Sequence, residues 1–278
     1  MEAKATGEVR HLDHFVVPVT DPDRAERFYS GVLGARTLKR EGDASLTRIF
    51  MKLGQNHIGL FSQNKAKIPK RDDLNSYPRH AFLVPESQYD PIAEKVRRAS
   101  PLAQEISRAA GLGCVWQDGL AFVDSEGNLL EIAKAKEAAR IRVHHLHFDT
   151  TDLDESIGFY TGILNFKLAQ RTDATAQVGI SGGQGDQCVV LHRVSDLSEA
   201  TKTMYRGRHF AFHVTDESFH AIVQALHRAG IEERDEHGER EGRRPGQLGT
   251  YFKEPSGFRL QITNEDSETF ARHAAEGA

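Results

Sequence analysis

The chain has 278 residues, with 36 Lys and Arg against 40 Asp and Glu, and its formal net charge is −4. Because the two signs of charge are mixed along the whole sequence, there is neither the basic surface that nucleic acid requires nor a polybasic membrane anchor. No stretch approaches the roughly 18 apolar residues of a transmembrane helix, and the N-terminal residues have no apolar core of signal-peptide length, so we expect a soluble cytoplasmic protein.

In chain order, the first half contains two similar units. Each begins with a strand, continues with a helix and ends with strands around a turn. The first helix follows Asp21, whose carboxylate can accept hydrogen bonds from the free N–H groups of the first helical turn. The predicted elements are strands at 11–19, 46–53, 56–62, 78–84, 120–124 and 129–134 and helices at 21–34 and 86–99.

The second half repeats the first. HFVVPVTDPDRAERFYSGVLG at 14–34 matches HLHFDTTDLDESIGFYTGILN at 145–165 with a spacing of 131 residues, and later segments match with a spacing of 130. A β-α-β-β-β unit therefore occurs four times, and a polar tail or a fraying helix is predicted from Ser267 onward. The predicted elements of the second half are strands at 143–150, 175–180, 187–194, 208–214, 249–253 and 258–264 and helices at 152–164 and 216–229.

The repeat predicts two tandem domains. They cover 8–135 and 141–266 and meet at the Ala- and charge-rich connector 133–140. Each unit has one apolar sheet face, and burying that face requires pairing of units around a shared concavity. We therefore predict an α+β fold in which each domain consists of two βαβββ modules that form a curved, partly open mixed sheet around a cleft. Cys114 and Cys188 lie in different halves without a CxxC partner, so we expect neither a disulfide framework nor a thiolate zinc site.

Several segments mark the repeated units. They are the openings LDHFVVPVTD and VHHLHFDTTD, the helix ends FYSGVLG and FYTGIL, the strand HFAFHV, and the closing segments FVDSEGNLLEI and YFKEPSGFRLQI. Over nearly the whole chain, these segments resemble the vicinal oxygen chelate superfamily, which includes glyoxalase I, fosfomycin- and bleomycin-resistance proteins and type I extradiol dioxygenases. Two fused modules with a histidine-rich second one look most like a two-domain extradiol dioxygenase. The resemblance implies iron in the C-terminal domain and a degenerate N-terminal copy.

Histidine is concentrated in the second half, where ten of the fourteen lie at or after residue 144. The resemblance implies that His145, His209 and Gln261 bind the metal. Alternate side chains of a strand share one face, so His147 points the same way as His145, and His144 is predicted to point away. Imidazole and carboxylate are the usual donors to Fe(II), and Gln261 stands where the family has the carboxylate. We expect this neutral amide to weaken metal retention.

The resemblance also implies the catalytic residues. His192 matches an acid–base histidine, which could move a proton between a catechol hydroxyl and bound oxygen near neutral pH. Tyr251 matches an active-site tyrosine whose phenol hydrogen-bonds a substrate hydroxylate. His147 and His213 face the predicted pocket, and Arg243 lies in a charged loop that could reach an acidic substrate, so these three are predicted substrate contacts.

The first half offers an alternative metal site. It would combine His14 and Glu131 with His57 or His80, either as a second site or as the only one. The opposite interpretation is a vestigial site, because Arg79 stands where the second half has a histidine. An Arg79–Glu131 pair would satisfy the buried carboxylate without a metal ion.

These features predict a non-haem Fe(II) enzyme of the extradiol type, a ring-cleaving dioxygenase that acts on a catechol-like aromatic. Its partners would be a small aromatic substrate and O2, with Mn, Zn or Ni as alternative metals, and the resemblance implies a homo-oligomer. One alternative is a glyoxalase-like metal-dependent lyase, isomerase or epimerase. Another is a non-catalytic protein that binds a small aromatic molecule.

Overall fold

The four predicted βαβββ modules are present in the protein. The computed structural model describes residues 7–42, 46–62, 74, 78–107, 118–136, 138–180, 187–206, 208–234 and 246–276. In module 1 the elements are β1 (Val9–Val19), α1 (Pro22–Leu33), β2 (Arg36–Gly42), β3 (Thr47–Leu53) and β4 (Asn56–Ser62). In module 2 they are β5 (Arg79–Pro85), α2 (Glu86–Ala99), β6 (Gln104–Ser107), β7 (Asp118–Val123) and β8 (Leu129–Ala135).

The second half has the same order with two additions. Module 3 contains β9 (Arg142–Thr150), α3 (Leu153–Gly162), β10 (Lys167–Arg171), β11 (Thr175–Gly179) and β12 (Cys188–Arg193). Module 4 contains β13 (His209–Val214), α5 (Asp216–Arg228), β14 (Glu233–Arg234), β15 (Gly249–Lys253) and β16 (Arg259–Thr263). The additions are α4 (Glu199–Arg206), which precedes module 4, and the C-terminal helix α6 (Ser267–Glu276).

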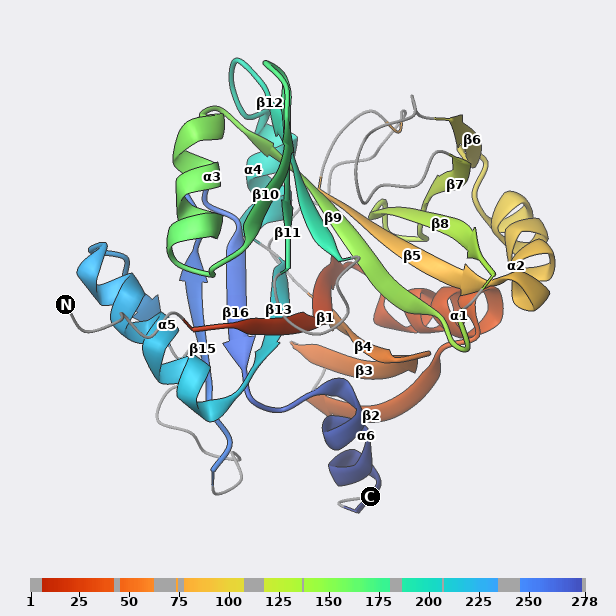
Figure 1. Ribbon diagram of the computed structural model, residues 1–278. Coiled ribbons are helices and arrows are strands. Elements are labelled where there is room, and N and C mark those ends of the chain that lie inside the picture. Colours follow the sequence, from red (N-terminus) through yellow and green to blue (C-terminus); the bar gives the residue numbers. More distant parts are fainter. Residues whose placement is uncertain are drawn as a thin grey trace.

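The modules pair across the two halves of the sequence. Sheet A has the strand order β14-β15-β16-β13-β1-β4-β3-β2, and sheet B has the order β10-β11-β12-β9-β5-β8-β7-β6. Sheet A thus joins module 1 to module 4 through the antiparallel pair β1 and β13, and sheet B joins modules 2 and 3 through β5 and β9. Figure 1 shows the first strand beside the late strands β13 and β16. The α+β class and the mixed sheets built from pairs of modules are confirmed, and each sheet has eight strands, but the sheets do not coincide with the segments 8–135 and 141–266.

Aspartate caps start the two equivalent helices, as the sequence predicts. Asp21 accepts a hydrogen bond from the backbone N–H of Arg24 at 2.9 Å, and Asp152 accepts one from Glu155 at 3.0 Å. Helix α1 ends at Gly34, whose φ of 74° lies in the left-handed region that favours glycine. Local sequence therefore determines where these helices begin and end.

The apolar core lies between the two sheets. Phe15 of β1 contacts Phe210 of β13 and Phe82 of β5, with ring centroids 6.4 and 5.6 Å apart. Helix α3 joins this layer, where Phe159 contacts Phe252 of β15 at 6.1 Å. Because neighbouring residues of a strand point to opposite faces, the residue before Phe15 faces away from the core. The outward faces of both sheets are thereby left for polar side chains.

Two buried amides connect the sheets near their central strands. Asn56 of β4 donates to the backbone carbonyls of Leu12 and Asp13 and accepts from the N–H of Val143 on β9. Its counterpart Gln187 donates to the carbonyl of Val143 and accepts from the N–H of Leu12. This reciprocal arrangement fixes β1 of sheet A against β9 of sheet B.

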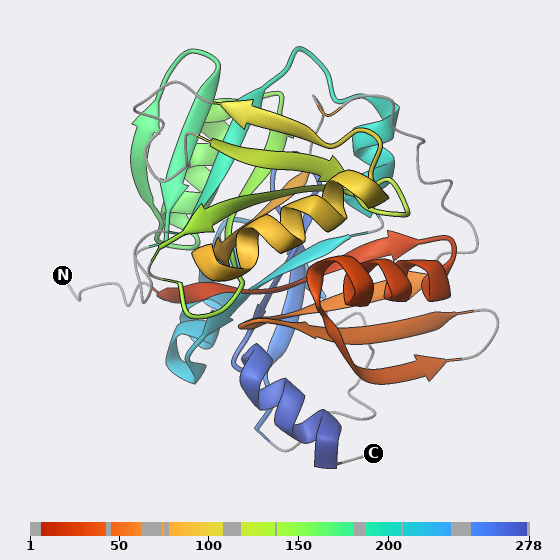
Figure 2. The ribbon, with the colours of Figure 1, turned by 90° about the vertical axis from the view of Figure 1, so that its right-hand side faces the viewer.

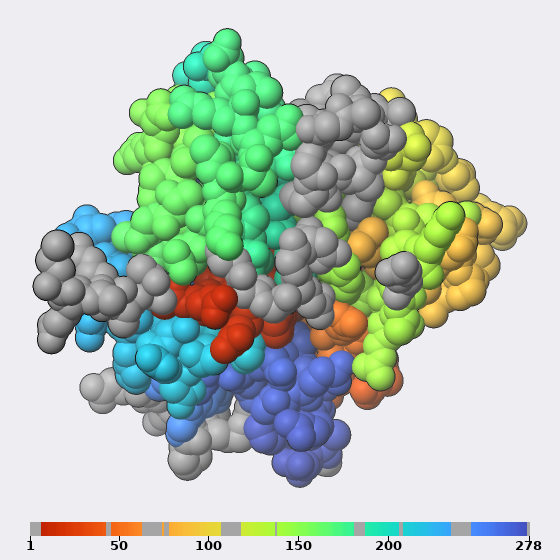
Figure 3. Space-filling view, viewed as in Figure 1, coloured from red at the N-terminus to blue at the C-terminus, as the bar shows by residue number. Residues whose placement is uncertain are grey.

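Helix α6 extends beyond the repeated modules. It lies against β2 and β4 at the lower part of the molecule in Figure 1, and the rotated view in Figure 2 shows it beside sheet A. In the space-filling view of Figure 3, the red N-terminal residues lie against cyan and blue residues of the C-terminal part. The polar C-terminal segment thus forms a helix that packs on the sheet built from both ends of the chain.

Candidate metal centre

Polar side chains gather at one equivalent place on each sheet. On sheet A they are His14, His209 and Gln261, which we call the sheet A centre. On sheet B the repeat spacing leads to His145, Arg79 and Glu131, which we call the sheet B centre. In both cases the residues come from the first strand of one module and from the first and last strands of the module paired with it.

The sheet A centre is built by strand register. Ala211 of β13 is paired with His14 on one side and with Gln261 on the other, and Gln261 is paired with Tyr251. Residues paired laterally point to the same face, and His209 joins them because it lies two residues before Ala211. The side-chain Nε2 of His14 lies 3.0 Å from Oε1 of Gln261.

The rings of His14, His209 and Tyr251 lie next to one another. The ring of His14 is perpendicular to that of His209, with centroids 5.6 Å apart, and Tyr251 contacts His209 at 5.0 Å. The exposed fractions of His14, His209 and Gln261 are 8%, 6% and 8%, so all three are buried. The side chains are thus held close together with little contact to solvent.

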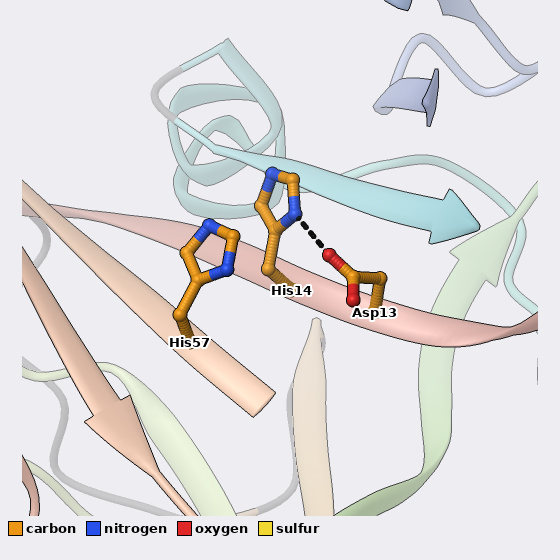
Figure 4. A group of neighbouring side chains, drawn as sticks. All are labelled: Asp13, His14 and His57. Carbon is orange, nitrogen blue, oxygen red and sulfur yellow. Dashed lines mark hydrogen bonds and ion pairs between the residues drawn. The ribbon is translucent and has the colours of Figure 1, made fainter. Parts of the chain in front are cut away.

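A β-bulge in β1 orients His14. The register pairs His11 with His213 and Leu12 with Phe212, but it then shifts so that His14, and not Asp13, pairs with Ala211. The bulged residue Asp13 lies next to His14, and its Oδ2 accepts from Nδ1 of that imidazole at 2.7 Å (Figure 4). A histidine that donates Nδ1–H to a carboxylate presents Nε2 as a lone-pair donor.

Asp13 is ionised in this environment. Its burial raises the pKa, but the nearby imidazole of His11, whose Nε2 lies 3.7 Å from Oδ1, and the hydrogen bond from His14 outweigh burial and hold the pKa of Asp13 well below its ordinary value. Its other oxygen, Oδ1, accepts the backbone N–H of Ser267 at 2.7 Å. The first residue of α6 therefore helps to fix the carboxylate behind His14.

His57 completes the group shown in Figure 4. Its ring stacks on His14 at a centroid distance of 4.1 Å, and Phe270 of α6 stacks on it at 4.4 Å. Nδ1 of His57 lies 2.9 Å from the hydroxyl of Ser267. Burial lowers the pKa of His57 well below its ordinary value, so this imidazole is neutral at pH 7.

The contact between His14 and Gln261 brings two possible metal ligands together. Nε2 of His14 lies 3.0 Å from the carbonyl oxygen Oε1 of Gln261, which accepts a hydrogen bond when Nε2 carries a proton. When His14 instead carries only the Nδ1–H that it donates to Asp13, the lone pair of Nε2 is available to a cation next to that oxygen. Imidazole nitrogen and amide oxygen are both ligands of divalent cations. The residues present therefore fit a metal ion.

The sheet B centre already holds a cation. Nη1 of Arg79 lies 3.2 Å from Oε2 of Glu131, and both side chains are buried. This is the ion pair predicted for a vestigial site. Glu131, His145 and His147 also place possible ligand atoms within 4.8 Å of one another, and Asp13, His14 and His57 do the same on sheet A. A metal ion bound by Glu131 would have to compete with the guanidinium of Arg79 for this carboxylate.

Four imidazoles form a chain beside Glu131. Nδ1 of His144 lies 2.9 Å from Nδ1 of His145, Nε2 of His145 lies 2.9 Å from Nε2 of His147, and Nδ1 of His147 lies 2.8 Å from Nε2 of His192. The prediction that His144 points away from His145 is wrong, because the register shifts between β5 and β9 at this point and creates a bulge.

The predicted site residues are therefore divided between the sheets. His209, Gln261 and Tyr251 lie together on sheet A, and His213 lies on the same face, where its ring contacts His11 at 4.7 Å. His145, His147 and His192 lie together on sheet B. The structure does not bring His145 to His209 and Gln261, and His14 occupies the corresponding place. Arg243 lies outside the described residues.

The alternative site in the first half is divided in the same way. His14 and His57 lie on sheet A, whereas Glu131 lies on sheet B, so they form no common site. His80 faces the core, where its ring stacks on Phe15 at 4.3 Å. Asp13 was not anticipated, because a β-bulge leaves no mark in the hydrophobic pattern of the sequence. The sequence offered one signal for it: Asp13 and His144 stand at equivalent positions of the repeat, but the two residues differ.

The cysteine prediction also needs correction. Cys188 is buried on β12 and is disulfide-bonded, whereas no disulfide was expected. Cys114 lies outside the described residues. Among the described residues, no helix is long and apolar enough to cross a membrane.

Comparisons with known proteins agree with this architecture. A model of the Glyoxalase/Bleomycin resistance protein/Dioxygenase superfamily matches residues 11–132 and 142–262. A protein from Bacillus subtilis subsp. subtilis str. 168 that is provisionally described as a dioxygenase has 15% sequence identity and a TM-score of 0.71, over 96% of this chain and 91% of that one. Glyoxalase I from Zea mays has 17% identity and a TM-score of 0.63, over 96% and 95% of the two chains.

Proposed function

Because the chain belongs to the Glyoxalase/Bleomycin resistance protein/Dioxygenase superfamily, we propose that it is a divalent-metal-dependent enzyme whose metal ion is bound by His14, His209 and Gln261. The observation that carries this proposal is the 3.0 Å distance between two possible metal ligands, Nε2 of His14 and Oε1 of Gln261, with Asp13 hydrogen-bonded to the other nitrogen of the imidazole. His209 lies on the same face and supplies the third donor.

The donor set determines which metal chemistry is favourable. Two imidazoles and an amide are neutral, so the nearest negative charge is Asp13, which is hydrogen-bonded to His14 at 2.7 Å. A carboxylate that accepts from a ligating histidine makes the imidazole a stronger donor and fixes its tautomer. Three protein ligands leave coordination positions open for a substrate.

The reaction that we propose first is ring cleavage of a catechol-like aromatic with O2, at Fe(II). The metal would supply open positions for two adjacent substrate oxygens and for O2. His57 is the neutral imidazole next to His14, and it would accept a proton from a catechol hydroxyl. Tyr251, which contacts the ring of His209, would donate its hydroxyl hydrogen to a substrate oxygen. His192, to which the sequence assigned the acid–base role, lies on sheet B, so we assign this role to His57 of sheet A.

A second candidate function is favoured by Gln261. A lyase, isomerase or epimerase of the glyoxalase kind needs a metal that polarises a carbonyl and does not change its oxidation state, so a neutral amide ligand is sufficient. Binding of a small aromatic molecule without turnover is the third possibility, and a weakly held metal ion would suit it.

The test begins with metal content. Protein purified without oxygen is loaded with Fe(II), Mn(II), Zn(II) or Ni(II), and bound metal is measured by mass spectrometry. We expect His14→Ala and His209→Ala to lose the metal, and Gln261→Glu to bind it at least about tenfold more tightly, or about 1.4 kcal/mol. His145→Ala, the equivalent change on sheet B, is the matched control and retains it. Loss of metal from His145→Ala with retention in His14→Ala would contradict the assignment.

Turnover then separates the functions. The metal-loaded protein is mixed with catechols in oxygenated buffer, and O2 uptake is recorded together with absorbance of a yellow ring-fission product. Fe(II)-dependent O2 uptake with product supports the dioxygenase. Conversion of a 2-oxoaldehyde adduct without O2 uptake supports the glyoxalase-like enzyme, and ligand binding without either supports a binding protein.

A further inference from the structure

Cationic side chains continue the outward face of sheet A beyond the metal centre. The register pairs Arg259 of β16 with His209 on one side and with Lys253 of β15 on the other. Arg234 of β14 is paired with Tyr251 in the same way. Since laterally paired residues point to one face, these three cations lie on the same side of the sheet as His209 and Tyr251.

A pocket of about 300 Å³ lies at this place. Its lining residues are Ile231, Glu232, Arg234, Tyr251, Phe252, Lys253 and Arg259. Among these described residues, three carry positive charge and one carries negative charge, and Glu232 is paired with Arg234 at 2.9 Å. The described residues that line the pocket next to Tyr251 thus include two further cationic side chains, Lys253 and Arg259.

The fold itself does not require these cations. At the repeat spacing of 130 residues, sheet B has Leu129 in place of Arg259, Val123 in place of Lys253, and Ala121 in place of Tyr251. Leu129 and Ala121 form a small apolar cluster, against which Val123 packs. The same sheet positions are thus compatible with purely apolar side chains, so a role in folding does not explain positive charge beside the sheet A centre.

We propose that the substrate of the sheet A centre carries a carboxylate, which Arg259 and Lys253 bind. This rests on the proposed function, because it assumes that the chelating oxygens of the substrate lie at His14, His209 and Gln261. Arg259 and Lys253 are one and two strands away from His209, roughly 5 to 10 Å at ordinary strand spacing. That separation suits an aromatic ring with two adjacent hydroxyls at one end and a carboxylate at the other. A guanidinium binds a carboxylate through two parallel hydrogen bonds.

The experiment compares two probes, of which one carries a carboxylate and the other its uncharged methyl ester. Binding of 3,4-dihydroxyphenylacetate and of its methyl ester is measured by calorimetry, without oxygen, on the Mn(II)-loaded protein. We expect the carboxylate to bind at least tenfold more tightly than the ester. In the test variants Arg259→Leu and Lys253→Val, each cation is replaced by the residue at the equivalent position of sheet B. Each variant is expected to reduce the preference for the acid at least fivefold. Lys167→Val, on exposed strand β10, is the matched control and keeps the preference.

The two proposals fail in different ways. Equal affinity for acid and ester in the native protein, or a preference that survives in the Arg259→Leu and Lys253→Val double variant, overturns the carboxylate site. If metal content and turnover of an uncharged catechol are normal at the same time, the proposed function still stands. A protein that retains no metal but still prefers the acid through Arg259 and Lys253 would instead keep the anion site and lose the proposed function.

Discussion

Glu254 lies in the turn between β15 and β16 and is a buried acid with an incomplete set of partners. Its Oε1 accepts the backbone N–H of Phe258 at 2.9 Å, whereas Oε2 has no hydrogen-bond partner among the described residues. The nearby hydroxyl of Tyr160 is also without one in the described part of the chain. Burial is the dominant influence on this carboxyl, and it raises the pKa of Glu254 from 4.5 to about 7.

This pKa makes the stability of the protein depend on pH. The folded state prefers the protonated acid, and unfolding restores the ordinary pKa, so the stabilisation is fully present below pH 4.5 and is lost as the pH rises to about 7. At roughly 1.4 kcal/mol per pH unit, the difference between the two pKa values corresponds to about 3 kcal/mol at pH 8. Glu254→Gln keeps a carbonyl for the N–H of Phe258 and removes the ionisation. We expect this variant to be more stable than the native protein by up to about 3 kcal/mol at pH 8 and to show little advantage at pH 5.

Urea unfolding at pH 5, 6, 7 and 8 and constant ionic strength, followed by circular dichroism, measures this difference. Tyr160→Phe is the control, because it removes an unpartnered buried hydroxyl without changing charge in this pH range, so its effect should not vary with pH. A stability difference between native protein and Glu254→Gln that is the same at pH 5 and pH 8 would refute the reasoning.

Three further changes probe the centres and their connection. Asp13→Asn removes the charge behind His14 and is expected to lower metal affinity about 10- to 100-fold, measured by competition with a chelator. Arg79→Ala leaves Glu131 buried without its cation and should cost about 3–5 kcal/mol in urea unfolding, part of which Glu131→Gln in the same chain should restore. Asn56→Ala removes one hydrogen bond between the sheets and two within sheet A and should cost about 2–3 kcal/mol, seen as a lower urea midpoint, whereas an unchanged midpoint would show that the amide is not a structural link.

Local structure could be predicted from the sequence because local signals determine it. The aspartates before α1 and α3 cap those helices, and alternation places His14 and His209 opposite the core residues Phe15 and Phe210. The repeat spacing identifies the equivalent positions on the two sheets. The Arg79–Glu131 ion pair was also predictable from the repeat, and in the structure Glu131 is paired with Ala81, which lies two residues after Arg79 and on the same face of β5.

The partner of each module could not be predicted, because all four modules have similar apolar faces. A pattern of hydrophobic residues shows that a module needs a partner and does not identify the partner. The sequence therefore assigned His145 to the centre that His14 occupies. The bulges at Asp13 and His144 were equally hidden, because one extra residue in a strand changes the register without changing the composition.

The pairing of module 1 with module 4 has a consequence for how the chain reaches its folded state. The strands of sheet B come from one continuous stretch, whereas the two proposed ligands His14 and Gln261 of sheet A are separated by 247 residues. During synthesis, β1 emerges before its partner β13 and before β16, which pairs with β13. We therefore expect sheet B to be complete while β1 still has one unpaired edge. Contacts between such distant residues form slowly, and an exposed strand edge promotes association with other chains. The sheet A centre would then be the last part of the molecule to form, and a ribosome that stops before β16 would release a chain with an ordered sheet B and without the proposed metal site.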